Sequence, residues 1–245
     1  TGEGEVRPPD LQGVEIPAHS RRSFNLGERV STYDVSTMVD CRDGLVICER
    51  AMYWGDTAGG GRELGHDSAG TLRPQKSWYL AEGATAGGFE TWVLVQNPGI
   101  HPVHAYFTLD TGEGEARPPD LQGVEIPAHT RRSFNLGSYV QTYDVSAVVW
   151  VPDGEVTSER AMYWSTGEGR PWRLGHDSVG VNSPSTTWYL AEGATAGGFE
   201  TWVLVQNTDP VAAHVYFTLD TGEGEVRPPD LQGVEIPAHS RRSFN

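Results

Sequence analysis

Two short stretches of the chain contain the residue types of a serine hydrolase. Leu64–Ser68 and Leu174–Ser178 both read LGHDS and hold the only adjacent His-Asp pairs of the sequence. A catalytic triad needs a serine that donates to a histidine, which an acid orients in turn. Adjacent side chains of an extended chain point in opposite directions, so neither stretch assembles a triad by itself. We therefore predict no catalytic residue, and we expect Asp67 and Asp177 to make local turn hydrogen bonds that pin their segments to a domain.

Acidic pairs are the second candidate chemistry. Glu90 with Asp110, or Glu82 with Asp177, could bind calcium between structural units, because extracellular modules use carboxylate oxygens in this way. The chain has no EF-hand spacing, and its glycine-rich stretches 83–88 and 111–115 lack the lysine of a phosphate-binding loop. The sequence therefore predicts no cofactor and no metal ligand, with calcium left as an open alternative.

The two cysteines lie close together in sequence. Cys41 and Cys48 flank an Asp-Gly turn signal, while Val151 and Ser158 occupy the corresponding positions 110 residues later. Either a disulfide or a pair of buried free thiols fits this spacing. A zinc site is not expected, because no histidine lies nearby in sequence.

Charge and composition exclude several classes of protein. With 33 acidic and 18 basic residues, the formal charge is -15, which is opposite to what nucleic-acid binding requires. The longest apolar run, 147–151, is far shorter than the roughly 20 residues of a membrane-spanning helix. The 30 glycines and 16 prolines are dispersed, which favours short strands joined by turns. We predict an all-β protein. Since the chain starts at Thr1 without a leader, we also expect it to be part of something longer.

Internal repetition dominates the organisation. Residues 1–110 and 111–220 align without a gap at 75 identical positions, and WYLAEGATAGGFETWVLVQN occurs unchanged at 78–97 and 188–207. Residues 221–245 match 1–25 at all 25 positions but match 111–135 at only 23. This pattern indicates a 220-residue period made of two unlike 110-residue units.

Turn signals and strand patterns place the unit boundaries. We predict one complete β-sandwich at 76–185, the C-terminal part of another at 1–75 and the N-terminal part of a third at 186–245. The expected strands of the complete unit are 77–82, 90–97, 103–110, 122–127, 130–136, 143–151 and 155–164. A connection with little strand character is expected between Trp164 and Trp188. Seven short strands at this spacing favour a Greek-key sandwich.

Four sequence blocks resemble a known kind of repeat. In order, they are WYLAEGATAGGFETWVLVQN, IPAHTRRSFNL, ERAMYW and LGHDS. Together they are similar to a tandem, immunoglobulin-like β-sandwich repeat of large bacterial cell-surface or secreted proteins. The resemblance implies an extracellular location and a repeated architecture, and it implies no catalytic motif.

The positions that differ between the two copies are candidates for a contact surface. Of the 35 differences, 26 fall between positions 28 and 77. Large apolar side chains replace polar ones, or the reverse, at several of them, and exposed residues of this kind mark interfaces. The predicted interface residues are Leu45, Ile47, Tyr139, Trp150 and Trp172. Drift after duplication is the alternative explanation.

These observations lead to a functional hypothesis and a rival. We expect a non-enzymatic structural repeat protein that forms a stalk or filament outside a bacterial cell and whose partners are other copies of itself, arranged head-to-tail or laterally. The rival is a carbohydrate-binding or adhesin module array, in which Trp150 and Trp172 stack on the sugar rings of surface glycans. Neither hypothesis includes a nucleic-acid partner or a membrane span.

Overall fold

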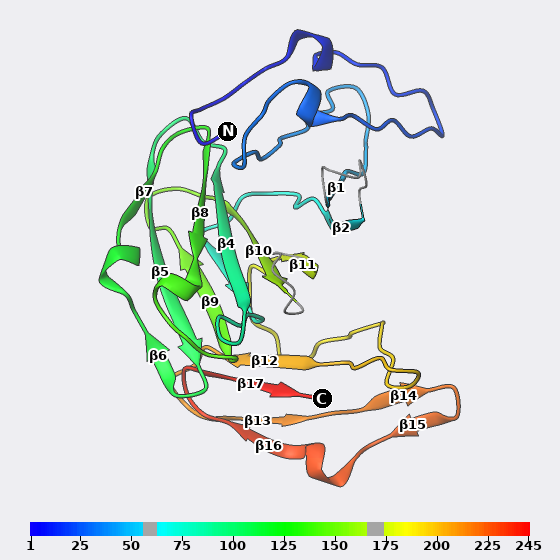
Figure 1. Ribbon diagram of the computed structural model, residues 1–245, viewed down its shortest axis with the longest axis vertical. Helices are drawn as coiled ribbons and strands as arrows, with labels where there is room; N and C mark the ends of the chain where they lie inside the picture. Colours follow the sequence, from blue (N-terminus) through cyan, green and yellow to red (C-terminus); the bar gives the residue numbers. More distant parts are fainter. Residues whose placement is uncertain (56–62, 166–173) are drawn as a thin grey trace.

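The structure is a computed structural model that describes residues 1–55, 63–165 and 174–245. The elements of these residues are β-strands and single-turn 3-10 helices, which confirms the all-β prediction. Figure 1 shows them in three successive parts, with the N-terminal segment at one end and the C-terminal segment at the other. The strands are β1 (Glu49–Trp54), β2 (Leu64–Ala69), β3 (Ser77–Leu80), β4 (Phe89–Asn97), β5 (Val103–Thr111), β6 (Gly114–Ala116), β7 (Val124–Ile126), β8 (Thr130–Asn135), β9 (Val145–Trp150), β10 (Thr157–Trp164), β11 (Leu174–Val179), β12 (Val203–Asn207), β13 (Ala213–Tyr216), β14 (Leu219–Thr221), β15 (Gly224–Val226), β16 (Gln232–Ile236) and β17 (Ser240–Phe244). The 3-10 helices are η1 (Pro9–Leu11), η2 (Leu26–Glu28), η3 (Pro119–Leu121), η4 (Leu136–Ser138) and η5 (Pro229–Leu231).

Strands β3 to β11 form two sheets, which we call the central sandwich. One sheet has the order β11-β10-β4-β8, and the other has the order β3-β9-β5-β6 with β7 also paired to β5. Alternation decides which face each strand buries. In β4, Val93 and Val95 are fully buried, while Leu94 between them and Trp92 before them are half-buried, as expected for a strand with one face toward a core.

The hydrophobic core lies between these two sheets. Each sheet contributes side chains with little or no exposure, and Phe107 of β5 meets Phe134 of β8 with ring centroids 4.7 Å apart. The other core residues are Trp78, Leu80, Val93, Val95, Val103, Ala105, Leu109, Leu121, Ile126, Leu136, Val145, Ala147, Val149, Val151 and Val156. All of them lie within the segment 76–185, where the complete unit was predicted.

The flanking segments repeat parts of the central pairing at an interval of 110 residues. The β1–β2 hairpin has the register of β10–β11, since Arg50 faces Ser68 as Arg160 faces Ser178. In the C-terminal segment, β12–β17 repeats β4–β8, β13–β16 repeats the start of β5–β7, and β14–β15 repeats β5–β6. In neither flanking segment do the described residues close a second pair of sheets around a core.

The sequence-based strand prediction missed two elements. One is β6, and the other is β11, which lies in the predicted strand-poor connection. Strand β11 packs closely against β10 because it has a glycine at position 175: a Cβ there would lie 2.6 Å from Cδ1 of Tyr163 on β10. The LGHDS motif therefore pairs along the sheet edge through its backbone, and its low content of apolar residues concealed a strand.

Candidate functional site

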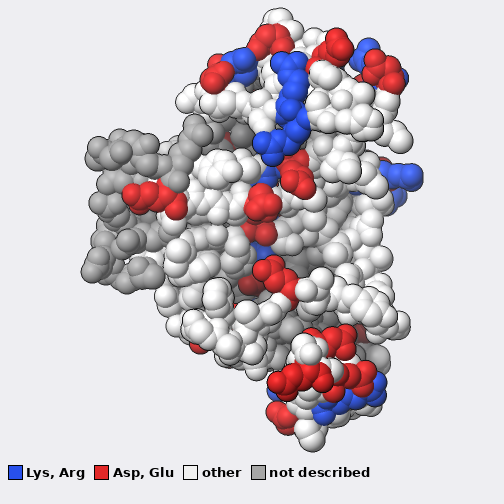
Figure 2. Space-filling view, turned by 90° about the vertical axis from the view of Figure 1, so that its right-hand side faces the viewer, with Lys and Arg blue, Asp and Glu red and all other residues white. Residues whose placement is uncertain are grey.

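The repeated segments meet at joints, and the polar residues singled out by sequence lie mainly there. In the LGHDS motif of β11, Ser178 Oγ donates to the carbonyl oxygen of Val179. Figure 2 shows charged side chains gathered at the two ends of one face, with a file of them between the ends. We use the word joint for a contact between two segments of the chain, and at each joint described below charged side chains of one segment pair with polar groups of the other.

The first joint packs the β1–β2 hairpin against β10 and β11. Arg50 of β1 forms ion pairs with Glu159 and Asp177, and its Nη2 lies 3.0 Å from Glu159 Oε2. His66 Nδ1 lies 2.7 Å from Asp177 Oδ1, and His66 Nε2 lies 3.3 Å from the Tyr163 hydroxyl. The prediction that Asp177 makes local turn bonds was therefore wrong: its partners come from a segment more than 100 residues away.

Asp177 is held ionised by these partners. Burial of its side chain opposes ionisation, but the hydrogen bond from His66 and the charge of Arg50 outweigh burial, so the pKa of Asp177 lies below its usual value. The equivalent arginine of the central sandwich, Arg160, pairs instead with Glu82 at 2.7 Å. Each of the two strand arginines thus has a paired head group, as expected for a buried arginine stem.

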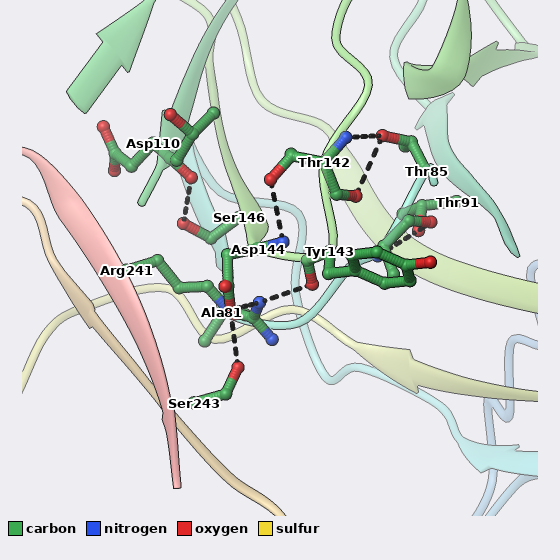
Figure 3. Close-up of polar contacts among 12 residues, drawn as sticks. Ala81, Thr85, Thr91, Asp110, Thr142, Tyr143, Asp144, Ser146, Arg241 and Ser243 are labelled. Carbon is green, nitrogen blue, oxygen red and sulfur yellow. Dashed lines mark hydrogen bonds and ion pairs between the residues drawn. The ribbon is translucent and has the colours of Figure 1, made fainter. Parts of the chain in front are cut away.

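The second joint binds β17 to the loop before β9 (Figure 3). Arg241 is 2% exposed and donates to Asp144 Oδ1 at 2.6 Å, to the Tyr143 carbonyl at 3.1 Å and to the Ala81 carbonyl at 3.1 Å. Ser243 Oγ donates to the same Asp144 oxygen at 2.6 Å. Desolvation lowers the pKa of Arg241, and the nearby Asp144 opposes that effect. Three acceptors around one guanidinium compensate for its removal from water.

The same joint occurs once more, 110 residues earlier. Arg131 of β8 donates to the carbonyls of Tyr33 at 3.0 Å and Val35 at 3.3 Å, and it lies 3.7 Å from Asp34 Oδ1. Ser133 Oγ donates to Asp34 Oδ1 at 2.7 Å. Desolvation lowers the pKa of Arg131 as it does that of Arg241. Two successive pairs of segments are therefore joined through the same residue types at equivalent positions.

A histidine and a glutamate face each other beside each copy of this joint. His129 Nδ1 lies 3.7 Å from Glu5 Oε2, and His239 Nδ1 lies 3.6 Å from Glu115 Oε2. Both histidines have positive φ, 55° and 49°, in the turn that precedes the joint strand. Buried Asp110 lies beside the second pair, where burial raises its pKa and a hydrogen bond from Gln206 opposes that shift.

The predicted calcium pairs do not assemble as proposed. Glu82 binds Arg160, and Asp177 binds Arg50 and His66. Glu90 accepts a hydrogen bond from the indole of neighbouring Trp92. Asp110 alone of these acids lies in a group of potential metal ligands among the described residues, together with Glu115 and His239.

The five predicted interface residues have different surroundings. Leu45 and Ile47 are fully exposed, but they lie in a segment without regular strand structure rather than on a hairpin face. Tyr139 packs against the core of its own sandwich. Trp150 is 45% exposed and packs beside Tyr106, with ring centroids 5.5 Å apart and ring planes tilted by 49°. Trp172 lies outside the described residues.

Cys41 and Cys48 are free and exposed. The two alternatives drawn from sequence, a disulfide or buried thiols, are both wrong, because the segment around Cys41 does not form the hairpin that would have turned the two side chains inward. Within the described ranges, no helix has the length and apolarity needed to cross a membrane.

Comparison with known proteins identifies no family for this chain. No family of known proteins matches the sequence, and no curated protein does. Several solved structures are similar to parts of it, among them the following two. Thermotoga maritima 1070 is 12% identical and covers 46% of this chain and 97% of its own, with a TM-score of 0.39. The Anabaena sensory rhodopsin transducer is 16% identical and covers 37% of this chain and 91% of its own, with a TM-score of 0.31. Both likenesses are too weak to indicate a function.

The joint residues were not predicted from sequence, because they lie at positions where the copies are alike. Arg131 and Arg241 are identical in type, as are Asp34 and Asp144. A joint that recurs at every step must use positions that the copies share. The available signal was a pair of polar residues, at i and i+2 on the outward face of β8, that is unchanged in each copy.

Proposed function

We propose that this chain belongs to a non-enzymatic structural repeat protein that forms a stalk or filament on the outside of a bacterial cell, built from tandem immunoglobulin-like Greek-key sandwiches with a 110-residue repeat. The observation that carries the proposal is the joint made twice, by Arg131 with the loop at Asp34 and by Arg241 with the loop at Asp144. A contact that uses two different surfaces of the unit and recurs at a fixed step generates an open array unless the rotation between units closes a ring.

A second set of joint donors, in the N-terminal segment, supports extension of the array in one direction. Arg21 and Ser23 stand at the positions of Arg131 and Ser133, and both are exposed. They offer the same donor pair that β8 and β17 present elsewhere. In the proposed array, the Asp-containing loop of the preceding unit accepts from these two side chains.

The apolar face of the C-terminal segment supports extension in the other direction. Trp188 is 55% and Leu190 67% exposed, whereas their counterparts Trp78 and Leu80 are 3% and 4% exposed inside the central sandwich. The central pair is covered by the sheets that include β9 and β10, and residues 26–75 carry the counterparts of β9 to β11. We propose that residues equivalent to 26–75, in a second copy or a further repeat, cover this face.

Assembly in solution tests the proposed architecture. Sedimentation velocity and electron microscopy of the 245-residue chain should show elongated particles that lengthen with concentration and carry a regular axial repeat. Arg21→Ala should shorten them, because it removes the donor of the open joint. Arg22→Ala serves as the control, because its counterpart Arg132 lies on the other face of β8 from Arg131. Compact monomers at all concentrations would contradict the head-to-tail arrangement.

Cellular location needs a separate measurement. An antibody raised against the chain should label intact bacteria that carry this sequence, and external protease should remove the label. Labelling that requires permeabilised cells would contradict the extracellular role without affecting the assembly result.

The exposed pair Leu45 and Ile47 tests lateral contact. Replacing both with the residues of the sister copy, Leu45→Glu with Ile47→Thr, should weaken assembly and leave the melting of the central sandwich unchanged. Each buried aliphatic side chain of this kind contributes about 1.5–3 kcal/mol, so loss of the pair is measurable. Equal assembly of variant and parent would favour drift after duplication.

One observation favours the carbohydrate-binding alternative. Trp150 and Tyr106 form a partly exposed aromatic pair on neighbouring strands β9 and β5, and such platforms suit stacking on the apolar face of a sugar. Trp150→Asp introduces the residue of the sister copy and is therefore a matched variant. Saturable glycan binding that this substitution abolishes would establish the alternative.

A further inference from the structure

The Asp110 carboxylate is buried at the joint between the central sandwich and the C-terminal segment, and one of its oxygens has no hydrogen-bond partner. Asp110 is 1% exposed. Its Oδ2 accepts from Gln206 Nε2 at 2.7 Å, but Oδ1 has no donor in the part of the chain that the structure describes. Leaving a buried carboxylate oxygen unpaired is costly, so a position of this kind indicates a missing ligand.

Two further metal-ligating groups surround this carboxylate. Glu115 of β6 lies directly opposite Asp110 in the β5–β6 hairpin, and His239 lies in the turn before β17. One ligand atom from each of Asp110, Glu115 and His239 lies within 4.8 Å of the other two. The β5–β6 hairpin thus places two ligands, and docking of the C-terminal segment brings the third.

We propose that Asp110, Glu115 and His239 form a binding site for one divalent transition-metal cation of the zinc class. Two carboxylates neutralise the charge of such a cation, and an imidazole nitrogen suits zinc or its neighbours better than calcium, which takes six to eight oxygen ligands. Three protein ligands leave a fourth position of a tetrahedral site for water. This chemistry differs from the calcium pairs suggested by sequence, which contain no histidine.

The distances are compatible with closure around a small cation. Ligand atoms about 2.0–2.1 Å from a tetrahedral zinc ion are roughly 3.4 Å apart, and His239 Nδ1 already lies 3.6 Å from Glu115 Oε2. Arg117 Nε donates to Glu115 Oε1 at 2.7 Å and so orients the carboxylate. Its Nη2 also donates to Oε2 at 3.2 Å, and this longer contact is the one that a bound cation displaces.

A cation held here joins the two segments. Asp110 and Glu115 belong to the central sandwich and His239 to the C-terminal segment, so coordination adds to the contacts of Arg241 at the same joint. The inference rests on the joint that carries the proposed function, but not on the location or the assembly of the protein.

The other joint provides a matched control within the same chain. His129 and Glu5 repeat the histidine–glutamate contact at 3.7 Å, but among the described residues no third potential ligand completes a group with them. His129 therefore faces one acid where His239 faces two. Binding at the full site should depend on His239 and not on His129.

Zinc titration of the full chain tests the site. Cys41 and Cys48 are exposed thiols that could bind zinc themselves, so the parent for all measurements carries Cys41→Val and Cys48→Ser, the residues of the sister copy. After treatment with EDTA and its removal, calorimetry should show one saturable equivalent of Zn²⁺. The visible absorption of bound Co²⁺ should report a tetrahedral site with nitrogen and oxygen ligands.

Two variants connect binding to the proposed residues. His239→Asn keeps a residue type that tolerates the positive φ of this turn, and Glu115→Gln keeps the size of the side chain. Each should weaken zinc binding by at least the roughly 10- to 100-fold that loss of an outer-shell partner costs, with an unchanged circular dichroism spectrum. His129→Asn should bind like the parent.

The outcomes separate this inference from the proposed function. A parent chain that binds no zinc saturably, His239→Asn and Glu115→Gln variants that bind as tightly as the parent, or an equal loss in His129→Asn would each overturn the site. The sedimentation and microscopy results for the metal-free chain are unaffected by any of these, so head-to-tail assembly can stand when the metal site fails.

Discussion

At the scale of single residues, the molecule is held together by charges buried between segments. Arg241 and Asp177 are both removed from water, and each keeps its charge because several partners surround it. Removing one partner of such a cluster leaves an uncompensated buried charge. We therefore expect substitutions at the joints to lower the free energy of unfolding by more than substitutions of exposed charges elsewhere.

Asp177 provides a pH-dependent test of the first joint. Its pKa is lowered in the folded state, so its contribution to stability is fully present above the unfolded value of about 3.9 and is lost as the pH falls through the folded value. Asp177→Asn should lower stability at neutral pH by about 1–3 kcal/mol, because Arg50 and His66 lose a charged partner while the partly exposed Arg50 keeps Glu159. The variant should also lack this part of the acid-induced loss.

The measurement is thermal unfolding followed by tryptophan fluorescence between pH 2.5 and 7. The matched control is Asp67→Asn, since Asp67 is the repeat counterpart of Asp177 and is exposed on β2. If the two variants have the same melting temperature and pH profile, Asp177 does not stabilise the joint.

At the scale of elements, identical sequences have different surroundings. Residues 78–97 and 188–207 are the same, yet β4 is central in a four-stranded sheet while β12 pairs with β17 in a two-stranded sheet. Strand β4 pairs with β8, and β12 pairs in the same register with β17, the counterpart of β8. The side chains of β12 are less buried than those of β4, because burial requires the second sheet.

Gly83 and Gly193 test this difference with the same substitution. A Cβ on Gly83 would lie 2.8 Å from the carbonyl oxygen of Val145, whereas a Cβ on Gly193 would have Thr201 as its nearest neighbour at 3.4 Å. Gly83→Ala should therefore destabilise the central sandwich by about 1–3 kcal/mol through overpacking. Gly193→Ala should change stability by a few tenths of that amount.

Chemical denaturation of both variants checks this prediction. In assembled particles, Gly193→Ala should become costly as well, because the proposed neighbour supplies the counterpart of Val145. Equal stability of Gly83→Ala and the parent would mean that β9 does not pack against the Gly83 backbone.

At the scale of the whole molecule, one closed core lies between two open segments. The core residues fall within 76–185, while large apolar side chains of both flanking segments are exposed. The division into a complete unit at 76–185 and two partial ones stays a prediction, and independent folding of the complete unit tests it.

Residues 76–185 expressed alone should unfold cooperatively with a β-type circular dichroism spectrum. The physical reason is that both sheets and all core residues are included, so the segment buries its apolar surface without help. Coincident melting by fluorescence and circular dichroism would establish a two-state unit. A broad transition would mean that the joints contribute to the core, and residues 186–245 alone are the control expected not to fold cooperatively.

The sequence by itself determined the strand content, the 110-residue step and most strand positions. Alternation of apolar and polar residues reports which side of a strand meets a core, and this local property survives wherever the strand is placed. The alternation did not predict β11, because this edge strand contains few apolar residues. Its backbone pairs with β10, and Gly175 packs closely against Tyr163.

Only the tertiary structure decided which polar residues meet. Asp177 finds Arg50 and His66 from more than 100 residues away, and Asp110 finds His239, because docking of separate segments places them together. No spacing within the chain encodes these distances, since each segment carries only half of the group. The repeat can be recognised from sequence because it is a property of the order of residues along the chain. The joint is a property of two surfaces, and it forms only where burial and charge compensation act on both surfaces at once.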